Sequence, residues 1–151
     1  MFKHLLIVVE CREGAWSAVV QGLALALRHE ATVTLALAVP HSAAVMVDMP
    51  GMPVLGGDAS SLEVARYGQQ AMLRAKHEAD RLGVQSRTEC IDFAGLPSAL
   101  AVRARAVGAD VIVMACEPVN AVVRLVTGSL VPGVLTASSV PVLVCPDLEL
   151  R

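Results

Sequence analysis

The sequence predicts an open, doubly wound α/β sheet of five parallel strands with helices packed on both faces. Short apolar runs alternate along the chain with longer segments in which apolar residues recur every three or four positions. Runs that are mostly apolar are typical of parallel strands covered on both faces. Strands separated by helices form βαβ units, whose crossovers require parallel pairing. At 151 residues the chain suits one domain, which we expect to span residues 1–151.

Five runs are predicted to be strands, and four of them are strongly apolar. The third is more polar, so we expect it at an edge of the sheet. Pro40 ends the second run, because proline has no N–H to donate to a sheet. The predicted strands are residues 5–9, 33–39, 84–91, 111–114 and 140–145.

Two long segments show helical spacing in the first half of the chain. The first follows Gly14 and carries this apolar stripe: Trp16, Val19, Val20, Leu23 and Leu27. The second runs from about 62 to 82, with most of its charged residues off the apolar stripe. Ser60 or Ser61 can cap it, and Gly83 stops it.

Two shorter helices are predicted in the second half. The third helix spans residues 96–107 and has Pro97 in its first turn, where proline is tolerated. The fourth runs from a Ser129 cap to about Ala137. Between the second strand and the second helix, residues 41–58 form a long loop rich in proline and glycine, and loops of this length are often functional or mobile.

Composition excludes several classes of partner. The net charge of −2 and the four aromatic residues argue against nucleic acid, which needs a basic patch and often stacking platforms. Residues 125–146 carry no charge, but their prolines and glycines prevent one membrane-spanning helix. The apolar run at residues 5–9 is too short for a secretory signal. We therefore expect a cytoplasmic protein with no membrane partner, and its four cysteines, which show no CxxC spacing, to be free thiols.

The strongest local signal for a ligand lies at the predicted start of the fourth helix. Thr127, Gly128 and Ser129 offer backbone N–H groups, a hydroxyl and the positive end of a helix dipole, with Arg124 just upstream. The same residues are also a common helix cap, and both interpretations stay open. The chain has no GxGxxG, GxxxxGK[ST], HExxH or GxSxG motif, so no standard phosphate, metalloprotease or hydrolase signature is present.

Five segments together resemble the universal stress protein family across essentially the whole chain. Each is weakly specific alone, but their order and spacing match the family. The segments are residues 3–9 followed by Glu10, then 35–39, 108–114, 124–129 and 140–144. The resemblance implies strand order 3-2-1-4-5 and a homodimer formed through the edge of the fifth strand. That strand and the fourth helix are uncharged, and an uncovered edge of this kind invites pairing.

ATP-binding members of the family carry G-x2-G-x9-G-[ST] in the loop after the fourth strand. Here Ala115 and Pro118 stand at the first two glycine positions, and Gly128 with Ser129 retains the third. Proline lacks an N–H and has a fixed φ, and Glu117 adds negative charge, so these changes argue against tight ATP binding. By resemblance the nucleotide- or anion-binding positions are these: Glu10, Val39, Ala115, Pro118, Gly128, Ser129 and Leu130.

Cys11 and Cys116 follow the first and fourth strands, which the family order makes neighbours. They are either two unrelated thiols or a redox pair or metal site, with Glu10, Glu117 and His41 nearby. No metal-ligand spacing supports the second interpretation.

The sequence favours a non-catalytic, dimeric stress-response or regulatory domain that acts through a protein partner or small ligand, with nucleotide binding lost or weakened. The alternative is an ATP-binding switch that uses Gly128 and Ser129. No general base for water is evident, so it would hydrolyse ATP slowly at most. A domain like those of electron-transfer flavoproteins shares the layer architecture, but the universal stress pattern accounts for more of the chain.

Overall fold

The computed structural model describes residues 1–10, 14–38, 59–91, 96–116 and 130–146. Its sheet has the order β3-β2-β1-β4-β5, and all four strand pairs are parallel. The predicted fold class and strand order are therefore confirmed. The strands are β1 (His4–Glu10), β2 (Thr32–Ala38), β3 (Ser86–Ile91), β4 (Val111–Ala115) and β5 (Val142–Cys145).

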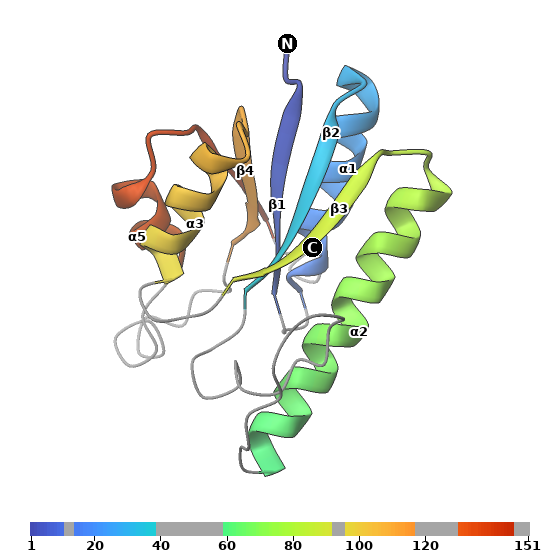
Figure 1. The fold of residues 1–151 in the computed structure, drawn as a ribbon, viewed down its shortest axis with the longest axis vertical. Coiled ribbons are helices and arrows are strands. Elements are labelled where there is room, and N and C mark those ends of the chain that lie inside the picture. The colour runs from blue at the N-terminus through green and yellow to red at the C-terminus, as the bar shows by residue number, and fades with distance from the viewer. Residues whose placement is uncertain (11–13, 39–58, 92–95, 117–129, 147–151) are drawn as a thin grey trace.

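Helices cover both faces of this sheet (Figure 1). The first and second helices pack on one face, where their buried residues share a core with β1 and β2. The third helix and the last one pack on the other face. The four helices are α1 (Trp16–His29), α2 (Ala59–Arg81), α3 (Leu96–Ala106) and α5 (Leu130–Ala137). In the described ranges, no helix is both long enough and apolar enough to cross a bilayer.

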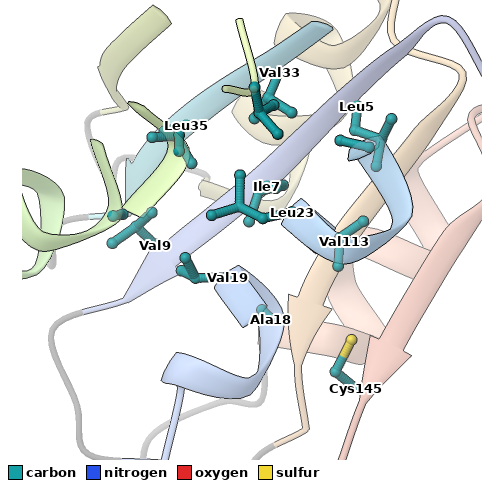
Figure 2. Close-up of a cluster of buried hydrophobic side chains, with 14 of the residues drawn as sticks. Leu5, Ile7, Val9, Ala18, Val19, Leu23, Val33, Leu35, Val113 and Cys145 are labelled. Carbon is teal, nitrogen blue, oxygen red and sulfur yellow. The ribbon is translucent and has the colours of Figure 1, made fainter. Parts of the chain in front are cut away.

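The central strand β1 serves two cores at once. Leu5, Ile7 and Val9 point toward α1 and α2, and Figure 2 shows them beside Val19 and Leu23 of α1. Leu6 and Val8 point the opposite way, toward α3 and α5. The whole run from Leu5 to Val9 is at most 2% exposed. This double burial explains why the run is continuously apolar rather than alternating.

The two edges of the sheet differ as the sequence indicates. The edge strand β3 carries Arg87 and Glu89 and has only its last residue, Ile91, buried. The other edge strand, β5, is apolar but only partly covered, because Leu143 is 40% exposed.

The buried face of α1 differs from the predicted stripe. Val19 and Leu23 are buried as expected, but Val20 and Leu27 are 39% and 51% exposed. Small residues face the sheet instead, and the closest approach is at Gly22. A Cβ at Gly22 would lie 2.6 Å from Ile7 Cδ1. The large apolar residues of the predicted stripe were a misleading guide, because α1 lies so close to β1 that small side chains must fill the contact.

The helix ends follow the sequence signals only in part. The predicted cap at Ser60 or Ser61 is wrong, because α2 already begins at Ala59 and includes both serines. Gly83 has φ +72° and ends α2, as predicted. Pro97 lies in the first turn of α3 and packs against α5, where a Cβ at Gly133 would be 2.7 Å from Pro97 Cγ. The loop at residues 41–58 and the Ser129 cap lie outside the described residues.

We expect Gly22→Ala to lower the free energy of unfolding by about 1–3 kcal/mol, because the added methyl would lie within 2.8 Å of two Ile7 side-chain carbons and force that buried side chain to shift. Denaturant unfolding would measure the loss. Gln21→Ala, on the exposed face of the same helix, should change stability by less than about 0.5 kcal/mol. Adding Ile7→Val, which removes Cδ1, should recover part of the loss. A Gly22→Ala variant as stable as the parent would contradict the close approach.

Candidate functional site

The sheet opens at the carboxyl ends of its two central strands. β1 pairs with β2 as far as Glu10 opposite Ala38, and β4 pairs with β5 as far as Ala115 opposite Cys145. The β1–β4 pairing, however, stops at Ile7 opposite Val113. The strand order also reverses between β1 and β4. Ligands of open α/β sheets bind outside the carboxyl ends at this switch point, so the candidate site lies here.

Three of the seven predicted site residues are described, and they divide between the two faces of the sheet. Glu10 ends β1 and is half-buried. It alternates with Leu6 and Val8, so it lies on the α5 face. Leu130 begins α5 and belongs to the core of that same face. Ala115 lies on the opposite face, in the core beneath α1.

The position of Ala115 bears on whether its methyl group obstructs a nucleotide. The residue is fully buried beneath α1, so its methyl does not project toward the α5 face. Its backbone is also unstrained, because Glu30 is the one non-glycine residue with positive φ in the described part of the chain. A glycine is therefore not required at residue 115 for conformation. This weakens one of the arguments that the sequence offers against nucleotide binding.

Four predicted site residues lie outside the described residues: Val39, Pro118, Gly128 and Ser129. The same holds for three members of the suggested thiol site, Cys11, His41 and Glu117. Whether Cys11 approaches Cys116 thus stays a hypothesis. Among the residues that the structure does describe, no three His, Cys, Asp or Glu side chains gather as a metal site would require.

The ends of β4 and β5 are joined by their backbones. The Cys116 N–H donates a 2.6 Å hydrogen bond to the Cys145 carbonyl oxygen. Cys145 is a buried free thiol, and burial raises its pKa above the ordinary value. A thiol held in this protonated form is a poor nucleophile and a poor metal ligand. Cys145 is therefore part of the core and not of a reactive site.

The model of the universal stress protein family matches residues 1–146. The chain belongs to this family. A universal stress protein family protein from Burkholderia pseudomallei has 21% identity and a TM-score of 0.67, with 95% of this chain and 96% of that chain covered. None of the curated proteins compared with the chain matches it.

Two further solved structures of the family contain nucleotides. One is described as a universal stress protein in complex with cAMP, and it has 18% identity and a TM-score of 0.67 over 97% of this chain and 98% of that one. The other is from Archaeoglobus fulgidus in complex with dAMP, with 14% identity and a TM-score of 0.60 over 96% and 98%. At these identities the likeness shows the fold alone.

This universal stress protein also contains a polar network near the opposite end of the sheet, where the strands begin. His4 Nδ1 is 2.6 Å from Thr32 Oγ1, and His4 Nε2 is 2.8 Å from Thr34 Oγ1. The Arg87 Nε–H donates to Thr34 Oγ1 at 2.9 Å. Thr32 Oγ1 donates to the Lys3 carbonyl oxygen at 3.3 Å.

The ring nitrogens of His4 donate or accept according to the tautomer, and the neighbouring contacts favour one arrangement. Thr34 accepts from Arg87, so its own proton is available for His4 Nε2. Thr32 gives its proton to the Lys3 carbonyl and therefore accepts from His4 Nδ1–H. The network therefore favours a neutral imidazole protonated on Nδ1. Burial lowers the pKa of His4, Arg87 lowers it further, and Asp110 and Glu89 act against them.

Two carboxylates act on this network. Asp110 accepts the backbone N–H groups of Lys3 and His4 at 2.6 and 2.9 Å, which lowers its pKa. Glu89 is bound through both oxygens by Arg103 of α3, and this hydrogen bonding lowers its pKa. The network was not predicted from the sequence. Its one signal was the pair of threonines two residues apart at the start of β2, which places both hydroxyls on one face.

We expect stability to fall as the pH drops below 6.5, the ordinary pKa of histidine. A lowered folded-state pKa means that the unfolded chain takes up the proton first, so protonation favours unfolding. Denaturant unfolding between pH 8 and 5 would measure this. His4→Gln should flatten the profile in that range, whereas His77→Gln on the exposed side of α2 should leave it unchanged. Equal profiles for His4→Gln and the parent would contradict the assignment. Stability should fall again below about pH 4, because Asp110 and Glu89 have lowered pKa values in the folded protein and lose their hydrogen bonds when protonated. This second loss should persist in both variants.

Proposed function

We propose that this chain is a non-catalytic, dimeric regulatory member of the universal stress protein family in which binding of nucleoside triphosphate is weakened. The observation that carries the proposal is Pro118, which stands at the second of the three loop-glycine positions. A phosphate loop works through backbone N–H groups that approach the ligand closely. Pro118 has no N–H to offer and a fixed φ, which removes a donor and limits how the loop can bend.

The position of Ala115 makes Pro118 the decisive change. Ala115 has an ordinary strand conformation and its methyl is in the core beneath α1. We therefore expect the alanine at position 115 to have little effect on a phosphate bound on the α5 face. The acid Glu117 adds repulsion toward a triphosphate in the same loop.

A nucleotide switch is the second candidate, and two observations favour it. The chain keeps an acid, Glu10, at the carboxyl end of β1, and it keeps Gly128 with Ser129. Two relatives of the same fold are described in complex with cAMP and with dAMP. A ligand with one phosphate group needs fewer loop N–H donors than a triphosphate, so weakened ATP binding is compatible with binding of a nucleoside monophosphate.

The non-catalytic part of the proposal rests on the chemistry at the opening between β1 and β4. The described ionisable groups nearest to it are Glu10 and two thiols, and the buried Cys145 thiol is held protonated. Efficient phosphoryl transfer needs a positioned base and charge stabilisation for the leaving phosphate. We therefore expect regulation through a partner protein, in the cytoplasm, rather than turnover of a substrate.

The proposed dimer uses the edge of β5. This strand ends the sheet that the described residues form, so within them one row of its backbone N–H and C=O groups has no strand beside it. Leu143 is 40% exposed there, and Leu135 of α5 is 53% exposed. A second copy of the chain would bury both the edge and these side chains.

We expect calorimetry with ATP and Mg²⁺ to show weak or no binding by the parent protein, and no nucleotide to be released from it on denaturation. Pro118→Gly should increase ATP affinity by about tenfold or more, since it restores an N–H donor to a charged ligand. Ala115→Gly is the matched control. It should leave ATP affinity unchanged and lower stability by about 0.5–1 kcal/mol, because glycine is unfavourable inside a strand. Micromolar ATP binding by the parent would favour the switch instead.

We expect sedimentation at micromolar concentration to show a dimer. Leu143→Lys should weaken it by about tenfold or more, because it places a charge at the edge where the two copies meet. The matched control is Leu73→Lys on α2, a residue that is 65% exposed and belongs to a helix packed over the other half of the sheet. A monomeric parent protein, or equal weakening by both variants, would count against the β5 interface.

A further inference from the structure

The two ends of α1 are completed very differently. At its carboxyl end Glu30 adopts the left-handed conformation with φ 51°, and its N–H bonds to the carbonyls of Ala26 and Leu27. Arg28 and His29 lie in the last turn, where positive charge is favourable. The negative end of this helix dipole is therefore well compensated within the chain.

Within the described residues, which begin at Gly14 on this side, the start of α1 shows no such compensation. Ala15 occupies the cap position and makes no side-chain hydrogen bond, and the first turn contains no acidic residue. The first N–H groups of an α-helix have no acceptor within the helix. They also carry the positive end of the helix dipole. An acceptor with negative charge would satisfy both requirements.

Ser17, in this first turn, provides the second and independent observation. It is 1% exposed, and its hydroxyl oxygen has no hydrogen-bond partner. The Cα–Cβ bonds of a helix tilt toward its amino end, so the Ser17 side chain leans toward the end where the first N–H groups lie. One of these groups, the Ala18 N–H, donates to the Ala15 carbonyl oxygen at 3.3 Å. A buried hydroxyl without a partner is unusual in a native protein and often marks the place of a bound ion or ligand.

A fixed positive charge stands beside this turn. The Arg74 guanidinium of α2 stacks on the ring of Trp16, with 3.9 Å from its carbon to the ring centroid. Arg74 has no ion pair within the described residues. The carboxylate of Glu10 belongs to the opposite face of the sheet, the α5 face, by its alternation with Leu6 and Val8. The Glu78 carboxylate, four residues along α2, interacts electrostatically with Arg74, but both of its oxygens already accept hydrogen bonds from Arg81.

We propose that the start of α1 binds a phosphate oxyanion. The first-turn N–H groups and the Ser17 hydroxyl donate hydrogen bonds to its oxygens, and Arg74 supplies the compensating charge. This subsite is distinct from the one at Gly128 and Ser129, because α1 and α5 cover opposite faces of the sheet. It is also independent of whether the loop containing Pro118 accepts ATP.

The oxyanion has two sources, inorganic phosphate and the phosphoryl group of a nucleotide. Titrations with inorganic phosphate and with AMP distinguish them, because a nucleotide subsite binds AMP more tightly than phosphate. Trp16 is the one tryptophan of the chain and immediately precedes Ser17. Its emission therefore reports directly on the first turn of α1. Sodium chloride at matched ionic strength corrects for general salt effects.

The test compares the full-length parent with Ser17→Ala and Arg74→Gln in these titrations. We expect saturable phosphate binding by the parent, weakened about tenfold or more in each variant, since hydrogen bonds to charged groups have this magnitude. Phosphate should also raise the melting temperature of the parent and not that of Ser17→Ala. In chloride, Ser17→Ala should melt no lower than the parent, because it removes only an unsatisfied hydroxyl.

Two matched variants serve as controls. Ser98→Ala removes an exposed hydroxyl from the first turn of α3, and Arg66→Gln removes an exposed guanidinium from α2. Both should bind phosphate as the parent does. The proposal is overturned if the parent shows no saturable response to phosphate or AMP, or if Ser17→Ala binds them as tightly as the parent. Tight ATP binding by the parent would refute only the weakened-triphosphate proposal, because Ser17→Ala tests this subsite separately.

Discussion

The complete burial of the middle of β1 is the constraint on which the rest of the structure depends. Five consecutive residues, Leu5–Val9, have at most 2% exposure, so helices must cover both sides of the strand. That requirement brings α1 so close that only glycine fits at residue 22. It also makes β1 the strand from which the chain winds in two directions, first to β2 and β3 and later to β4 and β5. The switch point at its carboxyl end follows from that winding.

Much of this arrangement could be read from the sequence because burial on two faces leaves a simple pattern. The apolar runs located all five strands to within two residues at most of their ends, and the polarity of residues 84–91 placed β3 at an edge. The face of α1 was harder to predict. Large side chains usually mark the buried stripe of a helix, but here the packing distance excludes them and Leu27 is left half-exposed. Periodicity alone contains no measure of how closely two elements approach.

The site was only partly predictable for a related reason. Spacing along the chain aligned Ala115 with a glycine of the ATP-binding pattern, but it could not tell that the methyl group lies in the core beneath α1. Orientation across a sheet depends on register, and register emerges only when the strands are paired. The network around His4 joins residues from three strands and was likewise invisible in any one segment. The unsatisfied hydroxyl of Ser17 is a property of the packed molecule and has no sequence pattern.

The alternation of β1 side chains has a consequence for how the molecule can change over time. Its odd-numbered residues from Leu5 to Val9 belong to one core and its even-numbered residues to the other. The strand therefore separates the two cores. A substitution that changes the packing of one core affects the packing of the other only if it displaces the β1 backbone, which is hydrogen-bonded to strands on both sides. The two faces of the same sheet edge can therefore acquire or lose ligands separately, and decay of one binding surface need not damage its neighbour.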